Sequence, residues 1–282
     1  MKLIYWLLAP ATLVLLALAA AACAPKANAS KALVLYYSQS SNTKAVAEQI
    51  ASLLNADIEA VLPVVPYDGT YQQTLQRAGQ ERESGQMPEI QPLKAKIADY
   101  DVIFIGYPVW YGTYAWPIAT LLEQVNFSGK KIVPFCTFGS GGLDSSIRDI
   151  AAKQPDAEVL PGYGVRAARL EAMPAEVEYF LKANGYLEGE VTPLDDFSDP
   201  HPASVEEAAI FDAAVGTYPM IRAKASTVAS RAIPDGTEYL FTAVDLPRPG
   251  FPPAPAGMPS SEMKIYVTVK EGAAPEFTQV VR

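Results

Sequence analysis

Hydroxyl and amide side chains gather in one short stretch of the sequence, SQSSNT at residues 38–43. The stretch follows the apolar run ALVLYY (32–37) and opens the segment TKAVAEQIASLLN (43–55), whose apolar residues recur at helical spacing. Free N–H groups at a helix N-terminus, together with the helix dipole, favour an anion. The pattern therefore predicts a phosphate site that needs no cationic residue, although such turns are also typical of simple helix capping. The side chains that can donate to a phosphate are those of Ser38, Ser40, Asn42 and Thr43.

Two further segments place aromatic residues or glycines directly after an apolar run, namely GYPVWYGTYAWP (106–117) and PFCTFGSGG (134–142). In an open parallel sheet, loops at the carboxyl ends of the strands meet at a crevice that binds ligands. Trp110 is the first candidate to stack on a flat conjugated ring, and Tyr111 is the second. Taken singly, the aromatic residues are equally consistent with core packing and the glycines with turns. Only the three segments together favour one ligand site.

Several other chemistries lack the residues they need. His201 is the only histidine and stands between two prolines, so neither a Ser-His-Asp triad nor a histidine metal site has a candidate in the main domain. No GxxxxGK phosphate loop occurs. Cys136 is expected to be a buried strand residue without a base to activate it. The net charge of −9 disfavours nucleic acid as a partner. We predict no catalytic residue and no metal ligand.

Strand-like and helix-like segments alternate between residues 31 and 187, which predicts an α/β fold with a parallel sheet covered on both faces. The expected strands are ALVLYYS (32–38), ADIEAVLPV (56–64), DVIFIGYPVW (101–110), KKIVPFCTFGSGG (130–142) and, more weakly, AEVLPGYGV (157–165). The expected helices are residues 43–55, the middle of 66–93, 115–125, 143–153 and 174–187.

The segment YYSQSSNTKAVAEQIA resembles the phosphate loop of the flavodoxin family, in which a strand, a Ser/Thr-rich loop ending in Asn-Thr, and a helix follow one another. The second and third loops fall where that family contacts its flavin. The resemblance covers residues 31–187 and is closest to a bacterial branch with Tyr-Pro-Ile/Val-Trp in the second loop. It implies a doubly wound five-stranded parallel sheet of order 2-1-3-4-5 and FMN as the cofactor.

Carried over by position, the resemblance assigns each loop a part of the FMN. The phosphate contacts fall on the side chains of Ser38, Ser40, Asn42 and Thr43, with backbone from Gln39 and Ser41. The ribityl chain and the ring are bordered by Pro108, Val109, Trp110, Tyr111 and Gly112, and on the other side by Thr137, Phe138, Gly139 and Gly142. The Gly112 carbonyl is expected to meet the flavin N5 proton. Ser41 stands where the family commonly has Gly, and Phe138 where relatives often carry a polar residue.

The first 22 residues have the layout of a secretory signal peptide, with Lys2 before an apolar run that ends in small residues. The segment ALAAAAC (17–23) resembles the bacterial lipobox, which implies lipidation of Cys23 and a tether over residues 23–30. An ordinary cleavage near Ala22 or an uncleaved anchor are the alternatives. The expected location is therefore extracytoplasmic, as a lipoprotein of the bacterial cell membrane or as a secreted protein.

The sequence beyond residue 187 predicts a linker (188–202) and a small α+β module (203–282). The module is expected to contain a helix at 205–216 and strands at 225–233, 237–246 and 263–271, with the tight turn PDG at 234–236. It is similar to bacterial cystatin-like modules found after flavodoxin domains. The inhibitor motif Gln-x-Val-x-Gly is absent, because residues 232–236 read AIPDG. A docking module for a protein partner, a lid over the flavin crevice and a structural appendage all stay open.

These features together predict an FMN-binding protein of extracytoplasmic electron transfer, with a redox partner protein or the quinone pool as partner. An FMN-dependent reductase of quinones or other small molecules is one alternative, so enzymatic activity stays open. The other is a cofactor-free binding lipoprotein with a flavodoxin fold.

Overall fold

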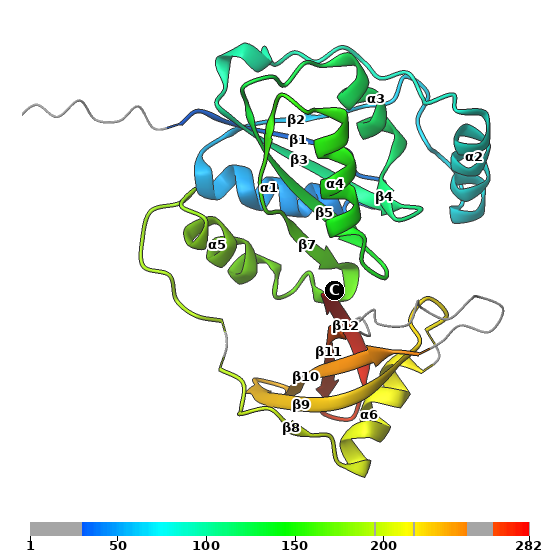
Figure 1. Cartoon of the computed structure of the whole chain (residues 1–282), viewed down its shortest axis with the longest axis vertical. Coiled ribbons are helices and arrows are strands. Elements are labelled where there is room, and N and C mark those ends of the chain that lie inside the picture. Colours follow the sequence, from blue (N-terminus) through cyan, green and yellow to red (C-terminus); the bar gives the residue numbers. More distant parts are fainter. Residues whose placement is uncertain (1–29, 195, 217, 247–261, 282) are drawn as a thin grey trace, which may run out of the picture. The chain divides into compact units, whose positions relative to one another are not determined.

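A parallel sheet organises the first part of the chain (Figure 1). The computed structural model describes residues 30–194, 196–216, 218–246 and 262–281. The expected signal peptide, Cys23 and nearly all of the tether lie outside these residues, as does the Pro-rich segment 247–261. Among the helices of the described residues, none is both long and apolar enough to cross a membrane.

The sheet runs β2-β1-β3-β5-β6, with β7 also paired to β5 and the two-residue β4 paired to β3. Its strands are β1 (Ala32–Tyr36), β2 (Asp57–Ala60), β3 (Val102–Trp110), β4 (Thr113–Tyr114), β5 (Lys131–Phe138), β6 (Glu158–Val159) and β7 (Tyr163–Arg166). With β4 set aside, this is the predicted order 2-1-3-4-5, and the predicted flavodoxin-like α/β class is confirmed.

The fifth strand position is split into β6 and β7 by Pro161 and Gly162. Proline has no N–H group for the ladder. The backbone at Gly162 also lies so close to β5 that an added Cβ would stand 2.4 Å from the Pro134 carbonyl oxygen. This explains why the segment around residues 157–165 reads as a weaker strand.

The sheet lies between two hydrophobic cores, because neighbouring side chains of a buried strand point to opposite faces. Ile103 and Ile105 of β3 pack on the face of α3 and α4, whereas Phe104 packs on the face of α1 and α5. Figure 1 shows the same layering of helices. The helices are α1 (Asn42–Leu54), α2 (Tyr71–Ser84), α3 (Trp116–Gln124), α4 (Leu143–Lys153) and α5 (Met173–Ala183), with the 3₁₀ helices η1 (Ile97–Asp99) and η2 (Ala167–Arg169).

An antiparallel sheet of order β12-β11-β10-β9-β8 and the helix α6 (Val205–Val215) form the second part, which we call the C-terminal module. Its strands are β8 (His201–Pro202), β9 (Ala223–Ile233), β10 (Gly236–Asp245), β11 (Glu262–Lys270) and β12 (Glu276–Val281). The three predicted strands are present, and Pro234 and Asp235 make the predicted turn between β9 and β10. The sequence did not predict β12, and β8 lies in the stretch expected to be linker.

Buried ionic groups join the C-terminal module to the parallel sheet. Arg169 of η2 hydrogen-bonds Glu176 of α5 and Glu238 of β10. Arg231 of β9 binds the second oxygen of Glu238 at 2.6 Å and reaches Asp196 at 2.9 Å. Residues 31–282 accordingly form one compact unit.

Candidate functional site

The first loop leaves backbone N–H groups free at the start of α1. No hydrogen bond uses the N–H groups of residues 40–43 among the described residues. The next N–H, that of Lys44, donates to Ser38 Oγ at 3.1 Å and thereby folds the loop back over the first turn of the helix. Such a row of unpaired N–H groups at the positive end of a helix is a physical site for an anion.

Ser41 adopts a left-handed backbone conformation, which is the conformation that the glycine common at this position in the family adopts without strain. It is the N-cap of α1, with φ 64° and ψ −6°, and its side chain makes no capping hydrogen bond. This conformation costs a non-glycine residue about 1–2 kcal/mol. The loop therefore keeps the backbone geometry that glycine would adopt freely, at a cost in stability.

An aromatic cluster that the sequence did not predict supports the second loop. Trp110, the last residue of β3, meets Tyr37 and Tyr67 edge to face, with ring centroids 5.8 and 5.0 Å away. The Gln39 side chain accepts a hydrogen bond from the Tyr37 hydroxyl and donates to the Tyr67 carbonyl at 2.5 Å. Burial raises the pKa of both tyrosines far above 10.0, so their hydroxyls remain donors. Gln39 therefore anchors the first loop through its side chain, in addition to the backbone role expected of it.

The second loop is a two-residue hairpin turn between Trp110 and Thr113. Tyr111 and Gly112 both have positive φ, 50° and 86°, which is the pattern of a type I′ turn. Tyr111 turns toward α2, where its hydroxyl donates to the Leu75 carbonyl at 3.2 Å and its ring stacks parallel to Trp116 at 6.0 Å. Both candidate ring partners therefore contact aromatic neighbours, and Trp110 is the one that also adjoins the first loop, through Tyr37.

The Gly112 carbonyl does not have the free position expected for contact with N5. It accepts a hydrogen bond from the Ser145 hydroxyl at 2.5 Å. That hydrogen bond joins the second loop to the first turn of α4, so the Gly112 carbonyl takes part in packing between these two segments. Pro108 and Val109, also at the end of β3, are half-buried.

The third loop touches both of the others. Thr137 Oγ1 lies 2.8 Å from Thr43 Oγ1, which joins the end of β5 to the start of α1. Gly142, with φ 117°, lies so close to the second loop that an added Cβ would stand 2.6 Å from Val109 Cγ1. The structure therefore brings the three predicted loops together at one edge of the sheet.

Phe138 and Gly139 face the C-terminal module. Phe138 packs against both the core under α4 and the core of the module. A Cβ added to Gly139 would lie 2.8 Å from the Tyr218 hydroxyl. The module is therefore a neighbour of the third loop. The hypothesis that it forms a lid over the flavin crevice stays a prediction.

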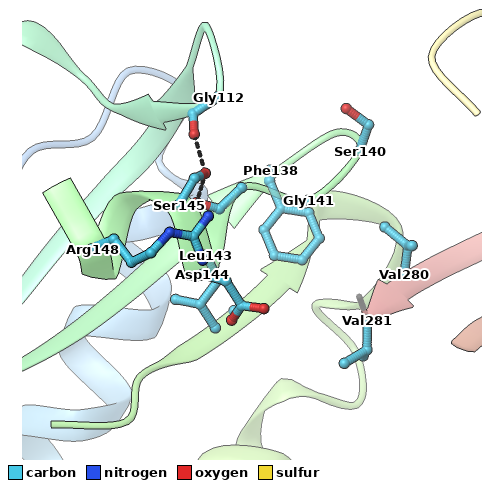
Figure 2. Close-up of a pocket in the computed structure, with 12 residues that line it drawn as sticks. Gly112, Phe138, Ser140, Gly141, Leu143, Asp144, Ser145, Arg148, Val280 and Val281 are labelled. Carbon is cyan, nitrogen blue, oxygen red and sulfur yellow. Dashed lines mark hydrogen bonds between the residues drawn. The ribbon is translucent and has the colours of Figure 1, made fainter. Parts of the chain in front are cut away.

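A cavity of about 380 Å³ opens beside the third loop (Figure 2). The second and third loops, the first turns of α4, β7 and the end of β12 contribute to it. Its lining residues are Gly112, Phe138, Ser140, Gly141, Gly142, Leu143, Asp144, Ser145, Arg148, Gly164, Val280 and Val281. Neither Arg148 nor the two valines stood out in the sequence.

Residues that could carry other chemistry are inert or remote in the described part of the chain. Cys136 is completely buried in β5, and burial raises the pKa of its thiol well above 9.0. His201 pairs with Glu207 at 3.0 Å in the C-terminal module. Among the described residues, no group of three or more His, Cys, Asp or Glu side chains could hold a metal ion.

The residues present fit a phosphorylated aromatic cofactor. The N–H groups of residues 40–43 suit a phosphate dianion, and the neighbouring Lys44 side chain is exposed and paired with Glu48 at 3.5 Å. Trp110 offers an aromatic surface at the neighbouring loop. The three contacting loops could then hold one ligand along its whole length.

A comparison with protein families identifies the family of this chain. A family model described as Flavodoxin matches residues 31–174, just over half of the chain. The chain therefore belongs to the flavodoxin family.

Two solved structures are similar to the first part of the chain. One, from Bacteroides eggerthii DSM 20697, is named as a candidate flavoprotein; it is 27% identical with a TM-score of 0.49, over 55% of this chain and 97% of that one. The other is a flavoprotein in complex with FMN from Lactobacillus acidophilus NCFM. It is 30% identical with a TM-score of 0.44, over 48% of this chain and 93% of that one.

Proposed function

We propose that the protein binds FMN at the three contacting loops and transfers electrons outside the cytoplasm. When bound, FMN supplies the redox chemistry, and the protein supplies binding, orientation and electrostatics. Residues 40–43 would hold the phosphate, and Trp110 would lie against the ring. Thr43 and Thr137 would fix the spacing between the loops on either side.

One observation carries this proposal: the row of unpaired N–H groups at residues 40–43, held by the left-handed Ser41 at the start of α1. Capping side chains satisfy such donors at α2 (Thr70) and α6 (Ser204), whereas α3, α4 and α5 also begin without one. The start of α1 differs in combining a left-handed serine cap with a loop rich in hydroxyl groups. Here the cap residue has a suitable hydroxyl that makes no capping hydrogen bond. The donors are therefore available to a ligand.

The location and partners are part of the same proposal. Lipidation of Cys23 would attach the protein to a bacterial membrane, within reach of the quinone pool or a redox partner protein. The C-terminal module, proposed here to be cystatin-like, would present a surface to such a partner. Secretion without a lipid is the alternative location.

The test is an FMN titration of the chain that begins at Ala24, followed by visible absorption and by FMN fluorescence. Saturable quenching is expected for the wild-type chain. Ser40→Asp should weaken binding about tenfold or more, because it sets a carboxylate against the phosphate. A carboxylate at a helix N-terminus stabilises the helix, so a loss of binding would not reflect unfolding.

Ser128→Asp is the matched control, because Ser128 is exposed in the loop that precedes β5, at the opposite end of that strand from the third loop. It should bind FMN as the wild type does. If the wild-type chain binds no FMN, the electron-transfer proposal fails and the cofactor-free binding lipoprotein replaces it.

An FMN-dependent reductase of quinones or other small molecules is the second candidate function. The cavity beside the third loop favours it, since a simple electron carrier needs no pocket for a second small molecule. Turnover of quinones by the FMN-loaded protein under a chemical reductant would distinguish it from a carrier.

A further inference from the structure

We propose that the cavity beside the third loop binds a quinone or its hydroquinone, and that the C-terminal module completes the binding wall. The proposal deepens the proposed function and rests on it for the source of electrons. Binding of the ligand itself needs no FMN. The volume of about 380 Å³ lies within the range of roughly 300–1,000 Å³ that is usual for small-molecule sites.

The walls of the cavity suit a flat apolar body. Figure 2 shows the ring of Phe138 between the first turns of α4 and the two valines of β12. Leu143 lies on the α4 side, and Val280 and Val281 lie on the β12 side. A ring compound placed here would bury its faces against these side chains, which favours flat, mostly apolar rings over sugars or other polar ligands.

The polar groups at one side of the cavity have mixed charge. Arg148 and Asp144 stand four residues apart on α4, and neither side chain makes a hydrogen bond or ion pair in the part of the chain that the structure describes. Arg148 can donate to a carbonyl oxygen, and Asp144 can accept from a hydroxyl. A quinone offers the first kind of group and a hydroquinone offers the second. A simple anion such as phosphate would meet repulsion from Asp144.

The β12 wall is held in place by contacts with the parallel sheet. Gln279 donates to the Gly164 carbonyl of β7 at 2.9 Å, and Arg166 hydrogen-bonds the Phe277 carbonyl. The Arg166 guanidinium also lies 3.6 Å from the centre of the Phe277 ring. Val280 and Val281 follow directly, so the module supplies a fixed wall. This gives the module a role at the site of the parallel sheet.

The ligand would bind next to the flavin ring. Gly112, Phe138 and Gly142 line the cavity, and the same three residues belong to the two loops assigned to the ring. This arrangement predicts simultaneous binding of FMN and the quinone. Competition between them would instead make the cavity part of the flavin site.

The test is calorimetric titration of the chain from Ala24 onward with duroquinone, whose four methyl groups block addition of thiols. Arg148→Met removes the donor and should weaken binding about three- to tenfold, since the side chain is exposed. Val281→Trp should fill the cavity and weaken binding more than tenfold. The matched controls are Arg222→Met and Val205→Trp, which change exposed residues that do not line the cavity and should bind as the wild type does.

Saturable duroquinone binding that both cavity variants weaken, and that persists at saturating FMN, supports the proposal. No binding, equal binding by all variants, displacement by FMN or displacement by inorganic phosphate overturns it. If duroquinone binds in this manner but FMN does not, the cavity stands and the proposed function fails. If FMN binds and duroquinone does not, the proposed function stands and the cavity proposal fails.

Discussion

The hydroxyls of Thr43 and Thr137 lie 2.8 Å apart, although the two residues are 94 positions apart in the sequence. Thr43 belongs to the first turn of α1, and Thr137 is the second-last residue of β5. Both are buried, so water does not replace the contact easily. The hydrogen bond therefore fixes the distance between the loop proposed to hold a phosphate and the loop proposed to border the ring.

Thr43→Val is expected to separate these two loops. Valine keeps the shape of threonine but removes the hydroxyl, which leaves Thr137 without this partner and should lower the free energy of unfolding by about 1–2 kcal/mol. FMN affinity should fall at the same time, as measured by fluorescence titration. Thr120→Val is the control, because Thr120 is also buried and its hydroxyl donates to the Pro88 carbonyl at 2.7 Å. This hydrogen bond lies outside the three loops. Wild-type FMN affinity in Thr43→Val, with the loss of stability, would show that the contact is structural only.

Ser41→Gly is expected to stabilise the protein. Glycine adopts φ 64° without the steric cost that serine has, and this gain should exceed the extra entropy of the unfolded chain by about 0.5–1 kcal/mol. Chemical denaturation with urea measures the difference.

Ser40→Gly is the comparison for this prediction, since Ser40 does not have a positive φ and should only lose stability. A lower stability of Ser41→Gly than of the wild type would mean that the Ser41 side chain makes a contribution that outweighs the strain.

The parallel sheet and the meeting of three loops were predictable because both follow from local patterns, whereas the strand order came from the resemblance to the flavodoxin family. Buried strands read as apolar runs, and the carboxyl ends of parallel strands share one edge. The orientation of side chains within the loops was not predictable in the same way. Tyr111 turned toward α2 because both turn residues have positive φ, and the Gly112 carbonyl went to Ser145. These outcomes depend on packing between segments that are distant in the sequence.

The C-terminal module shows the same limit. Its hairpin was predicted from the turn sequence, but β12 contains the polar residues Thr278 and Gln279, which the sheet and the neighbouring β7 bury. A strand with buried polar residues lacks clear alternation. The cavity therefore escaped prediction, because one of its walls belongs to β12.

Stability is expected to fall at alkaline pH because of Cys136. Burial raises the pKa of its thiol well above the ordinary 9.0, so the folded state keeps a proton that the unfolded state loses. Above pH 9 the unfolded state binds fewer protons, and the free energy of unfolding should drop by about 1.4 kcal/mol by pH 10 from this residue. Burial also raises the pKa of Tyr114 from 10.0 to about 12, which acts in the same direction at higher pH.

Urea denaturation at pH 7.5 and pH 10 checks this prediction, with Cys136→Ala as the variant that should lose the thiol's share of the pH dependence. In the chain that begins at Ala24, Cys136 is the only cysteine, so iodoacetamide labelling reports on it alone. Labelling should be slow in the folded protein and fast in urea. Rapid labelling of the folded protein would contradict the burial of this thiol.

Glu238→Gln is expected to weaken the junction between the parallel sheet and the C-terminal module. The Glu238 side chain is only 6% exposed and lies between Arg169 and Arg231, which also pair with Glu176 and Asp196. Glutamine keeps the shape but replaces two charge-assisted hydrogen bonds by weaker ones, so the free energy of unfolding should fall by about 1–3 kcal/mol. Glu171→Gln is the control. Glu171 also joins the two parts, through Lys270 at 3.3 Å, but its side chain is 87% exposed. Loss of this exposed ion pair should change the free energy of unfolding by less than about 0.5 kcal/mol.

If the β12 wall depends on this junction, Glu238→Gln should also weaken duroquinone binding while Glu171→Gln should not. Equal stability of the two variants would mean that the buried network does not hold the module in place.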